Sequence, residues 1–385
     1  MKLSTDRILT THVGSLPRPA DLLELLRQED RGEAVDEGAL HVRTTEAVKQ
    51  AVSDQVAAGV DVVCDGEMSK ISYHVYARHR LDGLVGTDGT GVPGRPAPRD
   101  MQDFPEIMAE SMRGGTELMT ATVCEGPVAY GDHAPLDRDI ANLTEAATAA
   151  KPADIFMNSV SPGCLSTYVP NRYYPDRDAY REDLIEAMRP EYEAIHKAGF
   201  VLQLDCPDLA GARHTDYQEM SENEFLADAE KSIEALNAAT ANIPPEAMRM
   251  HICWLNYSGP HTHDLPIKSL FDLLGKARPA GLLFEGANPR HEHEWEDWKA
   301  ADIPDNKVLV PGVIDSTSNF VEHPVLVAQR ITNYANIVGR ERVLAGSDCG
   351  FGTYAGRKGV FPSVVLAKFR AMAEGARIAT ERLWS

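Results

Sequence analysis

Short hydrophobic runs recur along the chain, and most of them are followed by polar or glycine-rich residues. Apolar, often β-branched runs of this length are typical of buried strands. The runs are Leu9–Val13, Val60–Cys64, Leu118–Val123, Asp154–Met157, Phe200–Asp205, Met248–Cys253, Gly281–Glu285, Val308–Val313 and Val343–Ala345. Most are separated by segments with helical spacing of apolar residues, such as Thr44–Ala58, Asp178–Ala198, Glu222–Ala239, Ile267–Ala277, Pro324–Val338 and Ser363–Leu383.

This alternation of strands and helices predicts βαβ units with a parallel sheet. Eight such repeats close an α/β barrel of the (β/α)8 TIM type, and the chain offers one candidate strand too many. The run Leu118–Val123 is the one we place elsewhere, because the turn-like residues Cys124-Glu125-Gly126-Pro127 follow it. We expect it to form part of a hairpin outside the barrel.

No linker divides the chain into separate domains. The least structured stretch is Gly83–Arg99, where glycines and prolines follow one another closely, and we predict a long loop there. A length of 385 residues fits one enlarged barrel, because barrels with insertions exceed about 400 residues. We therefore predict a single catalytic barrel domain over residues 1–385, with an excursion around residues 83–135.

The chain is strongly acidic, with 58 Asp and Glu against 38 Lys and Arg, which gives a formal net charge of −20. Nucleic acids and anionic membranes bind basic surfaces, so this charge argues against both as partners. No apolar run approaches the roughly 18 residues that a membrane span requires, and the N-terminus lacks a secretory hydrophobic region. We predict a cytoplasmic protein that acts on small molecules, with an oligomeric state that the sequence leaves open.

Residues capable of chemistry follow the predicted strands. They are Gly14-Ser15, Asp65-Gly66-Glu67, Asp205, His251 with Cys253, Glu285, Asp315 and Asp348-Cys349-Gly350. In a (β/α)8 barrel the active site lies at the carboxyl ends of the strands, so these residues would meet on one rim. Polar residues end strands in many proteins, and this explanation accounts for about half of these positions but less well for the cysteines and the histidine.

The triplet His251-Ile252-Cys253 is the most informative of these motifs. Residues i and i+2 of a strand project to the same face, so the imidazole and the thiol would point together into the barrel mouth. Cys349 and Glu285, at two other strand ends, could complete a tetrahedral set of the ligands that Zn²⁺ prefers. A single H-x-C is more often a structural accident, and the second cysteine is what makes a zinc site a serious alternative.

Five motifs, in order, resemble the catalytic zinc barrel of cobalamin-independent methionine synthases. They are Thr10–Arg18, Asp65-Gly66-Glu67, His251-Ile252-Cys253 with Asn256 and Gly259-Pro260-His261, Gly312-Val313-Ile314-Asp315, and Asp348-Cys349-Gly350. The resemblance covers nearly the whole chain. It implies the barrel type shared with uroporphyrinogen decarboxylase, and a zinc ion that activates a thiol.

The resemblance also implies roles for individual residues. His251, Cys253, Glu285 and Cys349 would bind the zinc, with Glu285 as the exchangeable ligand. Ser15, Glu67 and Asp205 would hold homocysteine, the two carboxylates by its amino group. Asp315 and His261 are the candidate catalytic residues. The expected reaction is transfer of an alkyl group, most simply a methyl group, to a thiol.

Two departures leave the donor open. The long synthases have a second barrel that helps to bind folate, and this chain has one. They also carry a histidine two residues after the aspartate of the fourth motif, where this chain has Thr317. The donor could be a folate, a methylcobalamin or an epoxide, because short members of the family include epoxyalkane:coenzyme M transferases.

The thiol substrate separates these two activities. Homocysteine carries an ammonium group, which Glu67 and Asp205 would pair with, whereas coenzyme M carries a sulfonate, which requires basic residues. Arg18, Lys70, Arg80 and Arg172 could build such an anion site. A non-catalytic zinc or corrinoid-binding module is the alternative from another class, but it would need four permanent ligands, and Glu285 is a weak one.

Several further residues have a simpler interpretation. Cys64, Cys124, Cys164 and Cys206 are expected to be buried thiols. His261 and His263 could form a second metal pair, although loop histidines are more often solvated. His291 and His293 lie in a polar stretch that is typical of a helix start.

Overall fold

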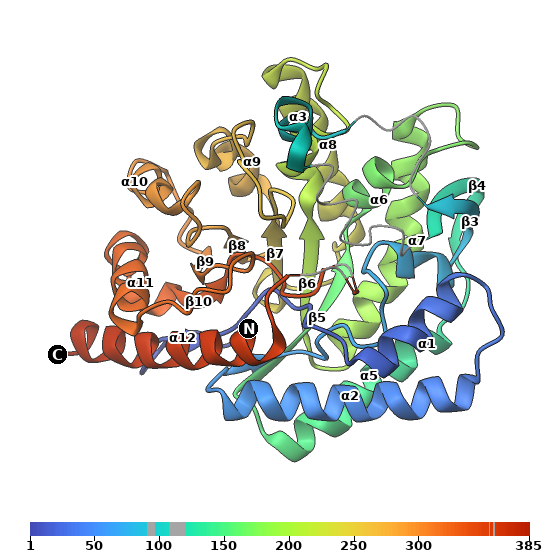
Figure 1. The fold of residues 1–385 in the computed structure, drawn as a ribbon. Helices are drawn as coiled ribbons and strands as arrows, with labels where there is room; N and C mark the ends of the chain where they lie inside the picture. Colours follow the sequence, from blue (N-terminus) through green and yellow to red (C-terminus); the bar gives the residue numbers. More distant parts are fainter. Residues whose placement is uncertain (91–96, 108–119, 354, 357–358) are drawn as a thin grey trace.

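The computed structural model describes residues 1–90, 97–107, 120–353, 355–356 and 359–385. Its main sheet has eight parallel strands in the order β1-β10-β9-β8-β7-β6-β5-β2 and curves into a nearly closed barrel surrounded by helices (Figure 1). The predicted (β/α)8 barrel is therefore confirmed. The eight runs assigned to the barrel all supply one of its strands.

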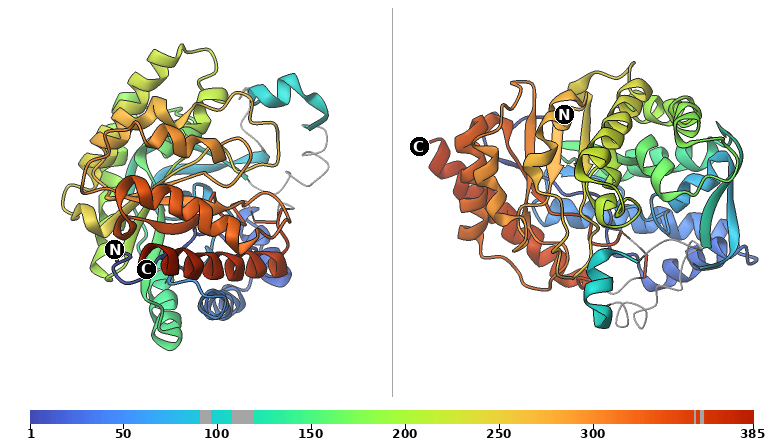
Figure 2. Two further views of the ribbon diagram at one scale, coloured as in Figure 1. Left: turned by 90° about the vertical axis from the view of Figure 1, so that its left-hand side faces the viewer. Right: turned by 90° about the horizontal axis from the view of Figure 1, so that it is seen from above.

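The barrel strands are β1 Leu9–Thr10, β2 Val62–Val63, β5 Asp154–Val160, β6 Val201–Cys206, β7 Met248–Ile252, β8 Gly281–Phe284, β9 Val308–Ile314 and β10 Leu344–Ser347. The α-helices around them are α1 Ala20–Asp30, α2 Glu37–Ala57, α5 Ala134–Ala150, α6 Pro162–Tyr168, α7 Arg177–Lys197, α8 Glu222–Ala239, α9 Phe271–Lys276, α10 Trp295–Trp298, α11 Pro324–Val338 and α12 Pro362–Leu383. The last two pack against each other on one side of the barrel (Figure 2).

The alternation of side chains along each strand divides the core into two layers. On β7, Met248, Met250 and Ile252 face the surrounding helices, in the same cluster as residues from α7 and α8. A second cluster fills the barrel itself and includes Val201 and Leu283. Because strand side chains alternate, Arg249 and His251 face the barrel interior, and the first residue after the strand, Cys253, continues that inward row.

The two end strands of the sheet, β1 and β2, meet at a seam that side chains complete. The backbone N–H of Asp61 donates to the carbonyl of Thr10 at 3.1 Å, and one carboxylate oxygen of Asp61 accepts from the Thr10 N–H at 2.9 Å. The hydroxyl of Thr11 donates to the carbonyl of Val62 at 3.0 Å. The barrel is thus closed by a few hydrogen bonds instead of a regular ladder.

A hairpin lies outside the barrel, as predicted, at the right-hand edge of Figure 1. It pairs β3 Leu81–Thr90 with β4 Thr120–Tyr130 in antiparallel register. The prediction of a loop over Gly83–Arg99 is therefore wrong for residues 83–90, which form a strand. Residues 91–96, 118 and 119 of the predicted loop and strand lie outside the described residues.

The excursion returns to the barrel through a short helix, α3 Arg99–Asp103, at the top of Figure 1. Its Asp100 accepts hydrogen bonds from the backbone and hydroxyl of Thr262 and from the hydroxyl of Tyr257. This helix is therefore fixed to the loop that follows β7, next to the predicted site. Among the described residues, no helix is long and apolar enough to cross a membrane.

Candidate active site

Three of the four predicted zinc ligands come together at the carboxyl ends of β7 and β10. One donor atom from each of His251, Cys253 and Cys349 lies within 4.8 Å of the other two, and all three residues are buried. The two sulfur atoms are 3.6 Å apart. The strand alternation that brings His251 and Cys253 to one face was visible in the sequence, whereas the approach of Cys349 follows from the closure of the barrel.

This group has the geometry and the donor atoms that zinc requires. Two thiolates at the usual Zn–S distance of about 2.3 Å lie roughly 3.8 Å apart in a tetrahedral site, which is close to the observed separation. His251 Nδ1 faces Asp205 Oδ1 at 3.5 Å, and its Nε2 is buried without a hydrogen-bond partner among the described residues. An unpartnered imidazole nitrogen beside two thiols is a ready metal donor.

A hydrogen bond joins the two thiols. The hydrogen bond from Cys349 lowers the pKa of Cys253 to about 6, and the same contact raises the pKa of Cys349 well above its usual value. Burial alone would lower the pKa of His251, but the Asp205 carboxylate and the Cys253 sulfur raise it. The group is therefore electron-rich and attracts positive charge.

Glu285, the fourth predicted ligand, is buried next to the group but does not complete it at the 4.8 Å separation. Its Oε1 accepts from the backbone N–H of Trp254 at 3.0 Å, and its Oε2 accepts from Asn288 Nδ2 at 2.8 Å. Burial raises the pKa of Glu285 to about 8, against the opposing effect of His291. Both carboxylate oxygens are thus engaged by the protein.

Asp205, at the end of β6, is the residue that faces Nδ1 of His251. Its Oδ1 also accepts from Gln203 at 3.0 Å, and its Oδ2 accepts from Asn158 at 3.1 Å. Gln203 in turn accepts from Arg249, which lies wholly inside the barrel, at 2.8 Å. A chain of polar contacts therefore runs from Arg249 in the barrel interior through Gln203 and Asp205 to His251.

The other predicted substrate residues line the same end of the barrel. Ser15 lies against Gly350, where an added Cβ would come within 2.0 Å of the serine hydroxyl, so a side chain at position 350 would displace that hydroxyl. Glu67 is buried with a left-handed φ of 56° and pairs with Arg18 at 3.4 Å. Burial raises the pKa of Glu67 to about 7, and Asp205 is near enough to add to that rise. Two carboxylates therefore approach each other, which favours a cationic group between them.

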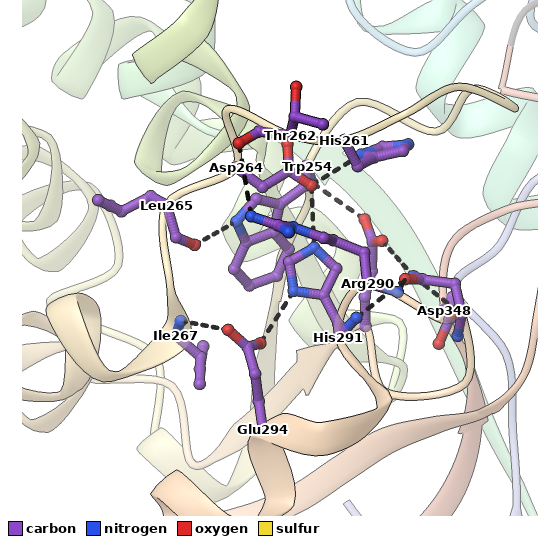
Figure 3. Close-up of polar contacts among 12 residues, drawn as sticks. Trp254, His261, Thr262, Asp264, Leu265, Ile267, Arg290, His291, Glu294 and Asp348 are labelled. Carbon is purple, nitrogen blue, oxygen red and sulfur yellow. Dashed lines mark hydrogen bonds and ion pairs between the residues drawn. The ribbon is translucent and has the colours of Figure 1, made fainter. Parts of the chain in front are cut away.

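His261 belongs to a buried network of imidazoles and carboxylates (Figure 3). Its Nδ1 contacts Asp264 Oδ2 at 2.7 Å, and its Nε2 contacts the carbonyl of Tyr257 at 2.9 Å. The same Asp264 oxygen contacts His291 Nε2 at 2.9 Å, and His291 Nδ1 contacts Glu294 at 2.9 Å. Because every partner of these nitrogens is an acceptor, both rings must carry two N–H groups and a positive charge.

The pKa values of these histidines agree with that assignment. Burial would lower the pKa of His261, but the bond to Asp264 raises it to about 9. His291 is raised to about 10 against the same effect of burial, by Asp264 and then by Glu294. His261, with a left-handed φ of 54°, is therefore a strained and charged residue at the barrel mouth.

The remaining predicted residues have local partners. Asp315 Oδ1 accepts from the N–H and the hydroxyl of Thr317, both at 2.9 Å, and so stabilises its own turn. His263 pairs with Asp103 on α3 at 2.6 Å, while both ring nitrogens of His261 contact other partners, Asp264 and the carbonyl of Tyr257. All four remaining cysteines are buried free thiols, as predicted: Cys64, Cys124, Cys164 and Cys206.

Several side chains of the candidate site are not predicted by the sequence: Asn158, Gln203, Arg249, Asp264 and Asn288. Gln203 and Arg249 each lie two residues before a predicted site residue, Asp205 and His251, and therefore point into the barrel as well. This i, i−2 spacing could have identified them. Asn288 and Asp264 lie in loops that read as ordinary turns, and their contacts join segments that are far apart in the chain. No local pattern identifies such residues.

Comparisons with known proteins identify relatives of similar sequence and fold. Residues 8–99 match the family model described as the catalytic domain of cobalamin-independent synthase. Methionine synthase of Saccharolobus islandicus is 24% identical over 380 residues, covering 97% of this chain and 95% of that protein, and methionine synthase of Sulfurisphaera tokodaii is 24% identical over 382 residues, covering 97% and 93%. A B12-independent methionine synthase structure from Shewanella sp. W3-18-1 superposes with a TM-score of 0.71 at 18% identity, over 98% and 99% of the two chains, and supports the fold.

Proposed function

We propose that this chain, a member of a cobalamin-independent methionine synthase-like family, is a zinc-dependent methyltransferase that methylates the thiol of homocysteine. The observation that carries the proposal is the buried group of His251, Cys253 and Cys349, whose spacing and unpartnered imidazole nitrogen suit zinc. The methionine synthases that align over nearly the whole chain supply the substrate and the reaction.

Zinc bound by these residues, with Glu285 as an exchangeable fourth ligand, would lower the pKa of a substrate thiol so that it reacts as a thiolate. Other residues of the chain would bind and orient the homocysteine. Ser15, Glu67 and Asp205 lie at the same rim, and the two carboxylates would accept hydrogen bonds from the ammonium of homocysteine. They would thereby orient the sulfur toward the incoming methyl group.

The methyl transfer balances as a simple displacement. The sulfur forms a bond to the methyl carbon while the bond from that carbon to its leaving group breaks, and the leaving group takes the electron pair. His261 would supply a proton to the leaving group from its Nε2, which in this structure contacts the carbonyl of Tyr257. Asp315 would hold the turn that faces the donor.

An amino-acid thiol is favoured over coenzyme M, because the basic residues that could bind a sulfonate are already paired with carboxylates. The pairs are Arg18–Glu67, Lys70–Asp65, Arg80–Glu191 and Arg172–Glu125. A sulfonate would have to displace one of these partners, whereas an ammonium could still pair with Asp205, which has no Arg or Lys partner among the described residues. Opening of an epoxide by coenzyme M therefore has no specific support here.

Metal analysis of protein purified without chelator tests the first part of the proposal. We expect one zinc per chain, and loss of zinc in Cys253→Ala and Cys349→Ala. Cys206→Ala is the matched control, because Cys206 is equally buried but faces the surrounding helices, and it should keep its zinc. Protein that contains no zinc, or a control that loses it equally, would contradict the proposal.

The zinc-loaded enzyme is then titrated with homocysteine and, separately, with coenzyme M while proton release is measured. We expect proton release with homocysteine alone, because zinc-bound thiols lose their proton. Release with coenzyme M alone would contradict the proposed substrate.

A further inference from the structure

The carboxylate of Glu285 lies outside the group of metal-donor side chains His251, Cys253 and Cys349, which we call the donor group. We propose that the backbone N–H of Trp254 and the side chain of Asn288 form a second binding position for this carboxylate, which we call the seat. Glu285 occupies the seat when a substrate thiol binds beside the donor group. Asn288 is then a positioning residue that sets the affinity for the thiol. The inference rests on the proposed function and adds to it.

The seat binds both oxygens of Glu285. Trp254 N–H donates to Oε1 at 3.0 Å and Asn288 Nδ2 donates to Oε2 at 2.8 Å. A buried carboxylate that leaves a cation must find donors of this kind, since an unpaired buried charge is costly. The Trp254 N–H and Asn288 Nδ2 supply these hydrogen bonds from within the protein, so that water is not needed.

Asn288 is held rigidly in the orientation that the seat requires. Its Oδ1 accepts from the backbone N–H groups of Arg290 and His291 at 3.0 and 3.1 Å. Its backbone N–H and its Nδ2 donate to Asp348 Oδ2 at 2.8 and 3.0 Å. Because Oδ1 is committed to N–H donors, Nδ2 is the only end of the amide that can face Glu285.

Asp348 connects the seat with the donor group. Its other oxygen, Oδ1, accepts from the N–H groups of Gly286 and Ala287, both at 2.8 Å. These residues directly follow Glu285, and Asp348 directly precedes Cys349. One carboxylate therefore fixes the start of the loop that carries the seat relative to a thiol of the donor group.

The Trp254 side of the seat is equally fixed. The indole is completely buried, its Nε1 donates to the carbonyl of Leu265 at 2.7 Å, and its ring packs on His291 with centroids 4.5 Å apart (Figure 3). The positive charge of His291 lies behind the seat and attracts the carboxylate. Both halves of the seat thus meet at His291.

The consequence is a balance between two positions of Glu285. Beside the donor group it competes with the thiol, and in the seat it leaves room for the thiol. Removing the donor atom of Asn288 should therefore shift Glu285 toward the donor group, which weakens thiol binding without weakening metal binding.

The test compares Asn288→Ala with the wild-type protein in two measurements. Zinc affinity is measured by competition with a chromophoric chelator, and homocysteine affinity by calorimetry on the zinc-loaded enzyme. We expect homocysteine to bind about tenfold more weakly, the effect of one hydrogen bond to a charged group, and zinc to bind at least as tightly. In a Glu285→Ala background the same change should have no effect on homocysteine affinity.

Asn171→Ala is the matched control. The side chain of Asn171 also accepts from two backbone N–H groups and donates to a carbonyl, but at a turn that contributes no residue to the site. It should lose a similar amount of thermal stability and keep its homocysteine affinity.

The outcomes separate this inference from the proposed function. Weaker zinc binding in Asn288→Ala, unchanged homocysteine affinity, or an equal loss in the Glu285→Ala background would overturn the seat alone. Wild-type protein that binds neither zinc nor homocysteine would overturn the proposed function, and the seat with it.

Discussion

Asp205 could support the proposed zinc site without being one of its ligands. The family resemblance implies that Asp205 contacts the substrate ammonium, and in the structure its Oδ1 also faces Nδ1 of His251. A carboxylate that accepts from one imidazole nitrogen fixes the tautomer and leaves the other nitrogen free for a metal. Gln203 and Asn158 keep that carboxylate in place.

We therefore expect Asp205→Asn to weaken zinc affinity by about 10- to 100-fold, as is typical when such a partner is lost. Chelator competition measures the effect directly. Glu67→Gln is the control, because Glu67 pairs with Arg18 and, among the described residues, makes no hydrogen bond or ion pair with the donor group. This variant should change homocysteine affinity while zinc affinity stays the same. Equal zinc affinity in Asp205→Asn and wild type would show that Asp205 serves the substrate alone.

His291 couples the stability of the protein to pH. Its folded-state pKa of about 10 lies above the ordinary value of 6.5, so the folded chain binds a proton more tightly than the unfolded chain. The contribution is therefore complete below about pH 6.5 and is lost as the pH rises toward 10. Asp264 and Glu294 contact the ring, and Glu285 and His261 are the nearby charges that modify this effect.

We expect His291→Gln to lower the free energy of unfolding more at pH 6 than at pH 10, as measured by urea denaturation across that range. His293→Gln, two residues away on an exposed side chain, should show no such trend. A destabilisation by His291→Gln that is the same at both pH values would mean that the ring acts by packing on Trp254 and not by its charge.

At the scale of elements, the sequence predicted what depends on local periodicity. Helix α11 has the predicted bounds, Pro324–Val338, because its apolar face repeats regularly and Pro324 begins it. The prediction of a loop is wrong for strand β3, because glycines interrupt its pattern and its pairing depends on β4, about forty residues later. Gly83, with φ +82°, sits at a register shift close to the carbonyls of Gly126 and Pro127, where a side chain would not fit.

Helix α3 shows how one such distant contact organises the barrel mouth. Asp100 is fully buried and receives three hydrogen bonds from Thr262 and Tyr257. Asp100→Ala should leave those donors unpaired and increase hydrogen exchange of the Thr262 amide and of α3 by about tenfold or more, while the global unfolding midpoint changes little.

The control for this prediction is Asp103→Ala on the same helix. Its ion pair with His263 is exposed, and exposed pairs contribute little. If both variants increase exchange to the same extent, the helix is held by general packing and not by the buried carboxylate.

For the whole molecule, the candidate site could be predicted where it depends on the barrel alone. The ends of parallel strands meet on one rim, and this rule alone predicts that His251, Cys253 and Cys349 lie close together. The polar interior below them was not predictable in this way. Arg249 lies over the Phe156 ring and donates to Gln203 and Thr11, partners from three other strands or their ends, and no local signal marks such an arrangement.

The closure of the barrel is itself a property of the whole molecule, and it depends on Asp61. The carboxylate accepts from the buried N–H of Thr10, so that β1 and β2 join without a ladder. Asp61→Ala should leave this donor unpaired and lower the free energy of unfolding by about 2 kcal/mol, with Asp61→Asn between the two because an amide oxygen can still accept.

Arg7→Ala removes the other partner of the same carboxylate and serves as the control. Arg7 is about half exposed, and exposed ion pairs contribute roughly 0–1 kcal/mol, so this variant should lie close to wild type. Urea denaturation of the three variants distinguishes the two contacts. If Arg7→Ala and Asp61→Ala are destabilised equally, the surface ion pair carries the effect, and the seam must be held by the hydroxyl of Thr11 and the packing of the core.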